Sequence, residues 1–357
     1  MEDRSGSVRT AAARRKFSPV AVPCGRRAYD VPPAPAPSLP LDVSFGSKRL
    51  FMSPSDHRDT REGFLFAGGA YFMWGFLPLY MKALAHVPAW EVVPHRILWS
   101  LPIAGLVVWW QGKAGALVKA ATTPRTLAMA FLTASLISVN WGTYVWAIGA
   151  GRALETALGY YINPLFSVFL AAVLIGERLS RPQVFAIFLA ALAVALLTWE
   201  AGGLPWVSIV LTVSWGFYAY FKRTLPVDPT QGFLLEVTLL ALPSLAMFGW
   251  LEREGASHFL HTGATDALLL VGSGVVTAIP LMLYATGAKL LRLSTIAVMQ
   301  YSAPTMIFLI AVFVFHEPFG ATKLAAFALI WTALVIYTWT LIAAARHRTR
   351  READPPR

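Results

Sequence analysis

The chain has 357 residues, of which 56% are hydrophobic and only 14% are charged, and its formal net charge is +11. A soluble domain has about a quarter of its residues charged, so this composition excludes a soluble enzyme or binding domain, whose surface could not be covered. The single cysteine, Cys24, excludes an intrachain disulfide scaffold. The basic residues lie in the tails and between apolar runs, which is typical of a membrane protein and not of a nucleic-acid-binding one.

The first 62 residues differ from the rest of the chain, because they are rich in Arg, Pro, Ala and Ser and have no helical periodicity. Such a segment cannot bury a core, so 1–62 is predicted to be a disordered basic tail. It has no apolar stretch that would make it a signal peptide. Several acidic residues argue against an Arg-rich targeting peptide, and we expect translation to start at Met52.

Ten apolar segments follow, each close to the 20 or so residues that a membrane-spanning helix needs. They are continuous runs and do not alternate between apolar and polar residues, which favours helices over barrel strands. The predicted fold class is therefore an all-α integral membrane protein with ten transmembrane helices. The segments are 64–84, 89–110, 127–149, 153–175, 182–200, 204–222, 232–251, 267–288, 293–315 and 322–345.

The predicted loops divide the basic residues unequally. With a cytoplasmic N-terminus, most of the 30 Lys and Arg residues fall on the cytoplasmic side, and the bias remains when the N-terminal tail is left out. Because cytoplasmic loops carry an excess of Lys and Arg, both termini are predicted to be cytoplasmic, and 346–357 forms a basic tail there. The predicted outer loops hold only Lys82, Arg152, Arg253 and Lys323.

An internal repeat emerges when the chain is aligned with itself at an offset of 140 residues. Residues that rarely coincide by chance match there: Arg152 with Arg292, Tyr161 with Tyr301, Pro164 with Pro304, and Glu177 with Glu317. The two predicted repeats are 63–203 and 204–345. Five helices each is an odd number, so the repeats cross the membrane in opposite directions, as in many secondary transporters. The alternative is duplication of a helical bundle that transports nothing.

The second segment carries three ionisable residues, Glu91, His95 and Arg96. A charged side chain inside a bilayer costs about 2.5–3.5 kcal/mol, so each is a functional candidate. Glu91 and His95 are four residues apart and share a helix face. Arg96 lies about 10 Å beyond the helix start and should face a cavity or an acidic partner. Either Arg96 binds a substrate anion while Glu91 or His95 carries protons, or the three residues form a structural cluster.

Glu236 lies in the first turn of the seventh segment, the repeat counterpart of the second. Inversion would place Glu91 near the outer face and Glu236 near the cytoplasmic face. Two carboxylates at opposite ends would suit the gates of an alternating-access transporter. They would equally suit carboxylates stabilised by the positive end of a helix macrodipole.

Proline occurs at matching places in the fourth and ninth segments, at Pro164 and Pro304. Proline removes a backbone donor and frees the carbonyl four residues back, and interrupted helices at symmetric positions indicate a transporter binding site. The alternative is an ordinary kink in a packed helix. Polar side chains that would line such a site are Asn140 and Trp141 in the third segment and Tyr161, Asn163, Gln300 and Tyr301 beside the prolines.

Other chemistries have no sequence signal. The chain contains no P-loop, no HExxH and no CxxC motif, and its histidines do not follow metal-ligand spacing. We therefore predict no ATP hydrolysis, no metal site, no cofactor and no enzymatic activity.

These residues resemble the RarD branch of the EamA transporters, a family in the drug/metabolite transporter superfamily. The resemblance spans 63–345 and implies ten helices, inverted repeats and a permease of the bacterial inner membrane, in a family associated by name with chloramphenicol sensitivity. The tail of 62 residues and the sixth-segment run 214–218 depart from the family pattern. The matching motifs are 74–80, 95–100, 140–141, 158–164 and 300–305.

The resulting functional hypothesis is a proton-coupled secondary transporter that exports a small metabolite or drug-like solute by alternating access. Its partners would be the solute, the lipid bilayer and protons, without nucleic acid, and a homodimer stays open. An uncoupled facilitator is the main alternative, and a membrane-embedded sensor or enzyme is a weaker one.

Overall fold

The computed structural model describes residues 59–353 except 177 and 292, and the account below is limited to these residues. The predicted disorder of the N-terminal tail and the expected start at Met52 fall outside them. The described part of the chain is helical and contains no strand. Its helices are α1 (Arg61–Ala83), α2 (Ala89–Trp110), α3 (Ala114–Ala121), α4 (Pro124–Gly149), α5 (Ala153–Leu170), α6 (Arg181–Ala201), α7 (Trp206–Thr224), α8 (Pro229–Glu254), α9 (Ala264–Leu290), α10 (Leu293–Met299), α11 (Ser302–Leu309) and α12 (Ala321–Ala353).

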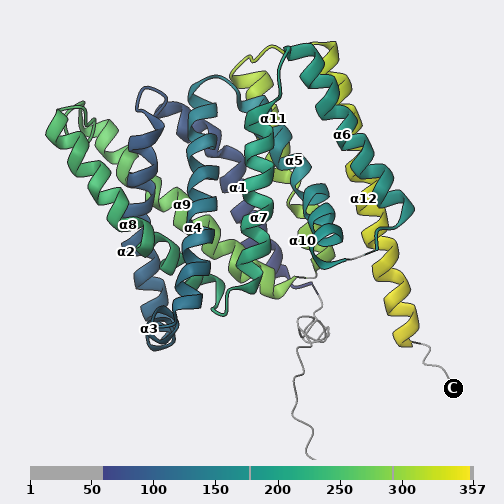
Figure 1. The fold of residues 1–357 in the computed structure, drawn as a ribbon, viewed down its shortest axis with the longest axis horizontal. Coiled ribbons are helices and arrows are strands. Elements are labelled where there is room, and N and C mark those ends of the chain that lie inside the picture. Colours follow the sequence, from purple (N-terminus) through teal and green to yellow (C-terminus); the bar gives the residue numbers. More distant parts are fainter. Residues whose placement is uncertain (1–58, 177, 292, 354–357) are drawn as a thin grey trace, which may run out of the picture. The chain divides into compact units, whose positions relative to one another are not determined.

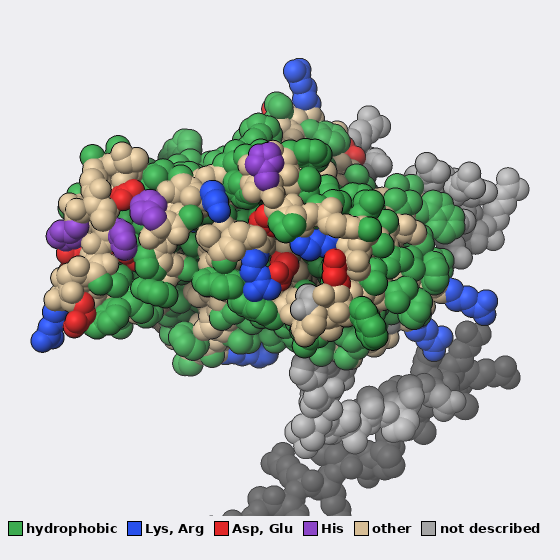
Figure 2. Space-filling view, turned by 90° about the horizontal axis from the view of Figure 1, so that it is seen from above, with side chains coloured by type: hydrophobic (Ala, Val, Ile, Leu, Met, Phe, Trp, Pro, Cys, Tyr) green, Lys and Arg blue, Asp and Glu red, His purple; other side chains and the backbone are tan. Residues whose placement is uncertain are grey.

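The helices are those of an integral membrane protein, as the sequence predicts. Nine spans among the described residues are long and apolar enough to cross a bilayer. Many of their outward side chains are large and apolar, and Figure 2 shows these covering the flanks of the molecule. The sixth predicted segment corresponds to α7. This helix is not among the nine spans, because its Ser, Thr, Tyr, Lys and Arg residues lower its mean hydropathy. This helix packs against α4 and α5 (Figure 1), so ten crossings stay the prediction.

Capping residues determine where α1 and α8 begin. The Thr60 hydroxyl accepts from Gly63 N at 3.0 Å, so α1 starts before the predicted first repeat. Asp228 and Gln231 form a capping box that starts α8 at Pro229, three residues before the predicted boundary. At the other end of the chain α12 continues to Ala353, so most of the predicted basic tail prolongs the last helix.

Helix pairing is the same in the two halves of the chain. The first helix of one half packs against the third and fourth spans of the other: α1 contacts α9 and α11, and α7 contacts α4 and α5. Close approach relies on glycine at equivalent positions, because a Cβ on Gly75 would clash with Met306 and one on Gly216 would clash with Phe166. This reciprocal pairing is what two inverted repeats require.

The proline-containing segments differ between the halves. Helix α5 continues through Pro164, whereas the matching segment is divided at Gln300 and Tyr301 into α10 and α11. The division lies one turn before Pro304, which has no N–H to donate to the Gln300 carbonyl. At the division Tyr301 N donates to Val298 O, three residues back. The predicted interruption is thus present on one side only. Both segments share a π-helical end, Ala171–Ile175 and Ile310–Val314.

Glu317 ties the two halves together. Its carboxylate, in the connection before α12, accepts from the backbone N of Ala153 at 2.6 Å and of Leu154 at 2.9 Å. These are free N–H groups at the start of α5, where a carboxylate also meets the positive end of the helix dipole. Glu177, which the repeat alignment matches with Glu317, lies outside the described residues.

Replacing Glu317 with Ala should destabilise the protein by about 1–2 kcal/mol, because two buried donors lose a charged acceptor. Thermal unfolding in detergent measures this loss. Glu254→Ala, at an exposed carboxylate, is the matched control. Equal unfolding temperatures for the two variants would contradict the capping role of Glu317.

Candidate functional site

Arg96 is a buried cation between the two halves of the bundle. It lies on α2 and is 2% exposed. Its Nε donates to the hydroxyl of Thr277 on α9 at 3.0 Å, and the guanidinium stacks over the Trp141 ring of α4 at 5.0 Å from the centroid. Its Nη1 has no hydrogen-bond partner in the described part of the protein.

Tyrosines surround this guanidinium. The side chains of Tyr80, Tyr144 and Tyr160 lie in the neighbourhood of Arg96. The Tyr160 hydroxyl donates to Asn140 Oδ1 at 3.2 Å, whose amide nitrogen donates to α7, whereas the buried Tyr144 hydroxyl has no partner among the described residues. We call these residues the Arg96 cluster: Tyr80, Arg96, Asn140, Trp141, Tyr144, Tyr160 and Thr277.

The Arg96 cluster lacks a carboxylate. No ion pair to Arg96 is formed by any residue that the structure describes. A buried charge costs several kcal/mol unless it is paired and hydrogen-bonded, and a cation–π contact and one hydroxyl offset only part of that cost. With Nη1 and the Tyr144 hydroxyl both unsatisfied, the cluster can accept an oxygen anion.

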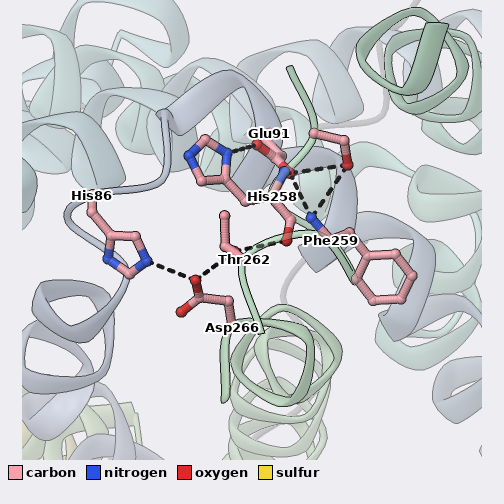
Figure 3. A network of polar contacts seen from close by, with 7 residues as sticks. His86, Glu91, His258, Phe259, Thr262 and Asp266 are labelled. Carbon is pink, nitrogen blue, oxygen red and sulfur yellow. Dashed lines mark hydrogen bonds and ion pairs between the residues drawn. The ribbon is translucent and has the colours of Figure 1, made fainter. Parts of the chain in front are cut away.

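Glu91 binds the connection between α8 and α9. Its carboxylate is 1% exposed and accepts from the backbone N of His258 at 2.6 Å and of Phe259 at 3.3 Å, while its other oxygen lies 2.7 Å from His258 Nδ1. Figure 3 shows this carboxylate pointing into the connection. Glu91 therefore bonds to His258 and not to His95, its expected neighbour on the helix.

A second contact fastens the same connection. His86, between α1 and α2, lies 3.1 Å from Asp266 of α9, whose carboxylate also accepts from the Thr262 hydroxyl at 2.6 Å (Figure 3). Histidines gather above α2 and α8 on the end of the molecule seen in Figure 2. At this end, the predicted outer face, α2 and the connection 255–263 are joined by ionisable groups.

Glu236 is paired at the opposite end of the bundle. Its carboxylate is 1% exposed, lies 2.6 Å from Lys222 Nζ of α7, and accepts from the Tyr218 hydroxyl at 3.3 Å. Lys222, the last residue of the sixth predicted segment, lies in the last turn of α7. The Lys222–Glu236 pair thus links α7 to α8.

His95 is held in one tautomeric form. Its Nδ1 accepts from Trp99 Nε1 at 3.1 Å, so this nitrogen carries no proton. Its Nε2 is buried without a partner in the described structure. A doubly protonated His95 would have to break the bond from Trp99.

The remaining candidates contact other helices. The Tyr161 hydroxyl bonds to Thr305 of α11 at 2.8 Å and its ring packs against Phe327 of α12. Gln300 donates to the Ala297 carbonyl of its own segment. Asn163 is buried with a free Oδ1, and Tyr301 packs against the main apolar core. Of the predicted site residues, only Asn140 and Trp141 join Arg96 in one cluster.

Comparison with known proteins decides the family. A model of the EamA-like transporter family matches residues 61–199. RarD from Streptomyces exfoliatus is 40% identical over 299 residues, 84% of this chain and 95% of that protein. The chain belongs to the EamA-like transporter family. RarD from Escherichia coli (strain K12) is 36% identical, covering 83% and 100% of the two chains. The uncharacterized transporter YojE from Bacillus subtilis (strain 168) is 37% identical, covering 80% and 96%.

The fold agrees with this assignment. A solved crystal structure superimposes with a TM-score of 0.51 at 20% identity, over 78% of this chain and 96% of that one. The RarD-type relatives and the apolar helices make this EamA protein a multi-pass inner-membrane transporter of the drug/metabolite transporter superfamily.

Sequence reasoning missed several residues of this EamA protein's polar clusters. Thr277, Tyr80 and Lys222 gave no signal, because each becomes significant only through a partner far away in the chain. His258 could have been noticed, since it lies in the polar connection between the seventh and eighth predicted segments. This connection is on the predicted outer side, where the second segment begins.

The Lys222–Glu236 pair of the EamA protein allows a double-mutant test. Lys222→Met should destabilise the protein by about 3–5 kcal/mol, because it leaves a buried carboxylate unpaired. The double variant with Glu236→Met should cost clearly less than the sum of the single ones. Unfolding in detergent measures all three, with Arg223→Met at the exposed neighbouring cation as control. Additive losses would show that the two residues do not interact.

Proposed function

We propose that this protein is a secondary transporter of small organic anions, and that the Arg96 cluster is where the anion binds. The observation that supports this proposal is that Arg96 is only 2% exposed and has neither a hydrogen-bond partner for Nη1 nor an ion-pair partner in the described structure. A carboxylate or phenolate would supply the missing charge and accept from Nη1. Thr277 and Trp141 hold the guanidinium in place for this contact.

The rest of the solute would be planar and largely apolar. Trp141 presents its ring face to the charge, and the rings of Tyr144 and Tyr160 in the same cluster lie 6.0 Å apart between centroids. Aromatic faces bind flat apolar groups, and hydroxyls beside them orient polar substituents. An aromatic carboxylate combines both features.

Transport would proceed by alternating access between the inverted halves, in the outward direction. The cluster takes residues from α2, α4 and α5 of one half and Thr277 of the other, so a change in packing between the halves would expose it to either side. The Glu91 contacts join the halves at one end, and the Lys113–Asp228 pair joins them beside Glu236 at the other, so these contacts would act as the two gates.

Protons are the coupling ion in this proposal, and Glu91, His95 and Glu236 are the candidate carriers. Each is engaged in the present conformation, Glu91 by backbone donors, Glu236 by Lys222 and His95 by Trp99. Opening the gate at the outer face would remove the backbone donors of Glu91, whereas His95 would have to break its bond from Trp99 on the same helix. Proton uptake by Glu91 would thereby follow gate opening.

Binding of benzoate should distinguish this site from a merely structural arginine. Benzoate should raise the unfolding temperature of the purified protein, because a ligand of the folded state stabilises it. The neutral analogue benzamide should have little effect. Arg96→Met should weaken benzoate binding at least about tenfold, as expected for a lost buried charge pair.

The control is Arg253→Met, at an exposed arginine, which should bind benzoate normally. A folded Arg96→Met protein with unchanged benzoate affinity would refute the anion site. Equal stabilisation by benzoate and benzamide would refute the role of charge.

Coupling is tested separately in inside-out vesicles that hold a proton gradient. Anionic solutes should dissipate the gradient only when the protein is present, and Glu91→Gln or Glu236→Gln should reduce this effect. Solute flux without proton movement would establish the alternative, an uncoupled facilitator.

A further inference from the structure

A pocket beside the Arg96 cluster lies on another face of α2, about 100° around the helix axis from Arg96. It is a half-open pocket of about 450 Å³ between α2, α8 and the connection 255–263. The lining is apolar except for one imidazole: His95, Leu98, Trp99, Pro102, Leu245 and Phe248, with Phe259 from the connection. Leu245 is 55% exposed, which places the open side on the lipid-facing flank of α8.

The imidazole of His95 supplies the pocket with a single hydrogen-bond donor. Because Nδ1 accepts from Trp99, the proton of the neutral ring is on Nε2. Nε2 is buried and has no partner among the described residues. The neighbouring rings, Phe248 at 5.5 Å and Phe259 at 4.9 Å between centroids, offer no lone pair. A buried donor without an acceptor carries a desolvation penalty that a suitable ligand would remove.

The connection that carries Phe259 closes one end of this pocket. Its backbone donates to Glu91 from His258 and from Phe259 itself, so Phe259 is fixed next to the imidazole. Phe248 and Phe259 also meet edge to face at 5.9 Å. The pocket is therefore preformed in this conformation, with two aromatic walls and one polar point.

The depth of the donor indicates what kind of molecule fits. His95 lies six residues beyond the start of α2 at Ala89, about 9 Å deeper in the bundle at 1.5 Å per residue. The ester groups of a phospholipid stay at the interface, so an anchored lipid would place only its acyl chain beside His95 and leave Nε2 unsatisfied. A free molecule dissolved in the bilayer can place an acceptor at that depth.

We propose that this pocket binds a neutral amphiphile with an aromatic body and one hydrogen-bond acceptor, such as a ketone, which enters laterally from the bilayer and accepts from His95 Nε2. The site is separate from the proposed anion site: Arg96 and His95 are adjacent in sequence but face different helices, Arg96 toward α4 and α9 and His95 toward α8. It gives the protein a second class of ligand.

Benzophenone tests the proposal, because it is a neutral aryl ketone that crosslinks to nearby C–H groups on illumination. Membrane vesicles containing the full chain are labelled at increasing benzophenone concentration, and the modified peptides are mapped by mass spectrometry. Saturable labelling within 95–102 and 245–259 is expected. Labelling that does not saturate, or that lies elsewhere, would overturn the proposal, since a pocket filled by phospholipid chains would give that result.

Variants distinguish the donor from the apolar walls. His95→Leu should raise the half-saturating benzophenone concentration about three- to tenfold, the effect of one hydrogen bond to a neutral group. His95→Gln, which keeps an amide donor, should retain most of the affinity. Leu245→Trp should fill the pocket and abolish saturable labelling. Unchanged labelling of a folded Leu245→Trp protein would contradict the assignment whatever the His95 variants do.

Arg96→Met keeps this test independent of the proposed anion transport. It should leave benzophenone labelling unchanged even though benzoate binding is lost. Parallel loss of both ligands in Arg96→Met would show that the two regions are one site and would overturn the proposal of a second one.

Discussion

A positive charge without a negative partner is the constraint around which this bundle is organised. Arg96 is buried between the two halves of the chain, and its described neighbours are aromatic rings and hydroxyl groups without a carboxylate. The protein could have neutralised Arg96 internally, as it does for Lys222 with Glu236. Leaving the charge unmatched costs stability, and in the proposed function this charge is what the anion binds, in a place from which water is excluded.

The polar contacts at the ends of the bundle differ from those at its centre. Near the predicted outer face a carboxylate accepts backbone donors from a connection, and near the other face a carboxylate meets a lysine. The Glu91 contacts join the two halves at one end. At the other end the halves are joined beside the Lys222–Glu236 pair, where Lys113 Nζ lies 3.1 Å from Asp228, and the Arg96 cluster lies between the two ends. Breaking one set at a time would open the centre to one side only, which is the requirement for alternating access.

Much of the architecture follows from local sequence, because apolar runs of sufficient length can satisfy their backbone only as helices. Arg96, Asn140 and Trp141 could be recognised in the same way, as costly or unusual groups inside apolar segments. The observed helix ends differ from the predicted ones by a few residues where Thr60 and Asp228 act as caps. The sequence also did not reveal that the helix would continue through Pro164 and be divided before Pro304.

The partners of the ionisable residues could not be predicted. Glu91 bonds to a connection 167 residues away, and Arg96 to a threonine 181 residues away. The spacing of Glu91 and His95 favoured a bond along the helix, but two backbone N–H groups and the His258 ring are better donors for a buried carboxylate. The spacing of residues in the sequence shows which contacts along a helix are possible, and the packing of the folded protein determines which of them form.

A structure of the protein bound to 4-bromobenzoate would test the central claim most directly, because anomalous scattering locates the bromine without ambiguity. The account predicts a carboxylate oxygen about 3 Å from Arg96 Nη1, with the ring beside Trp141 and Tyr160. A bound ligand elsewhere, with Arg96 paired to a carboxylate of the protein, would contradict it.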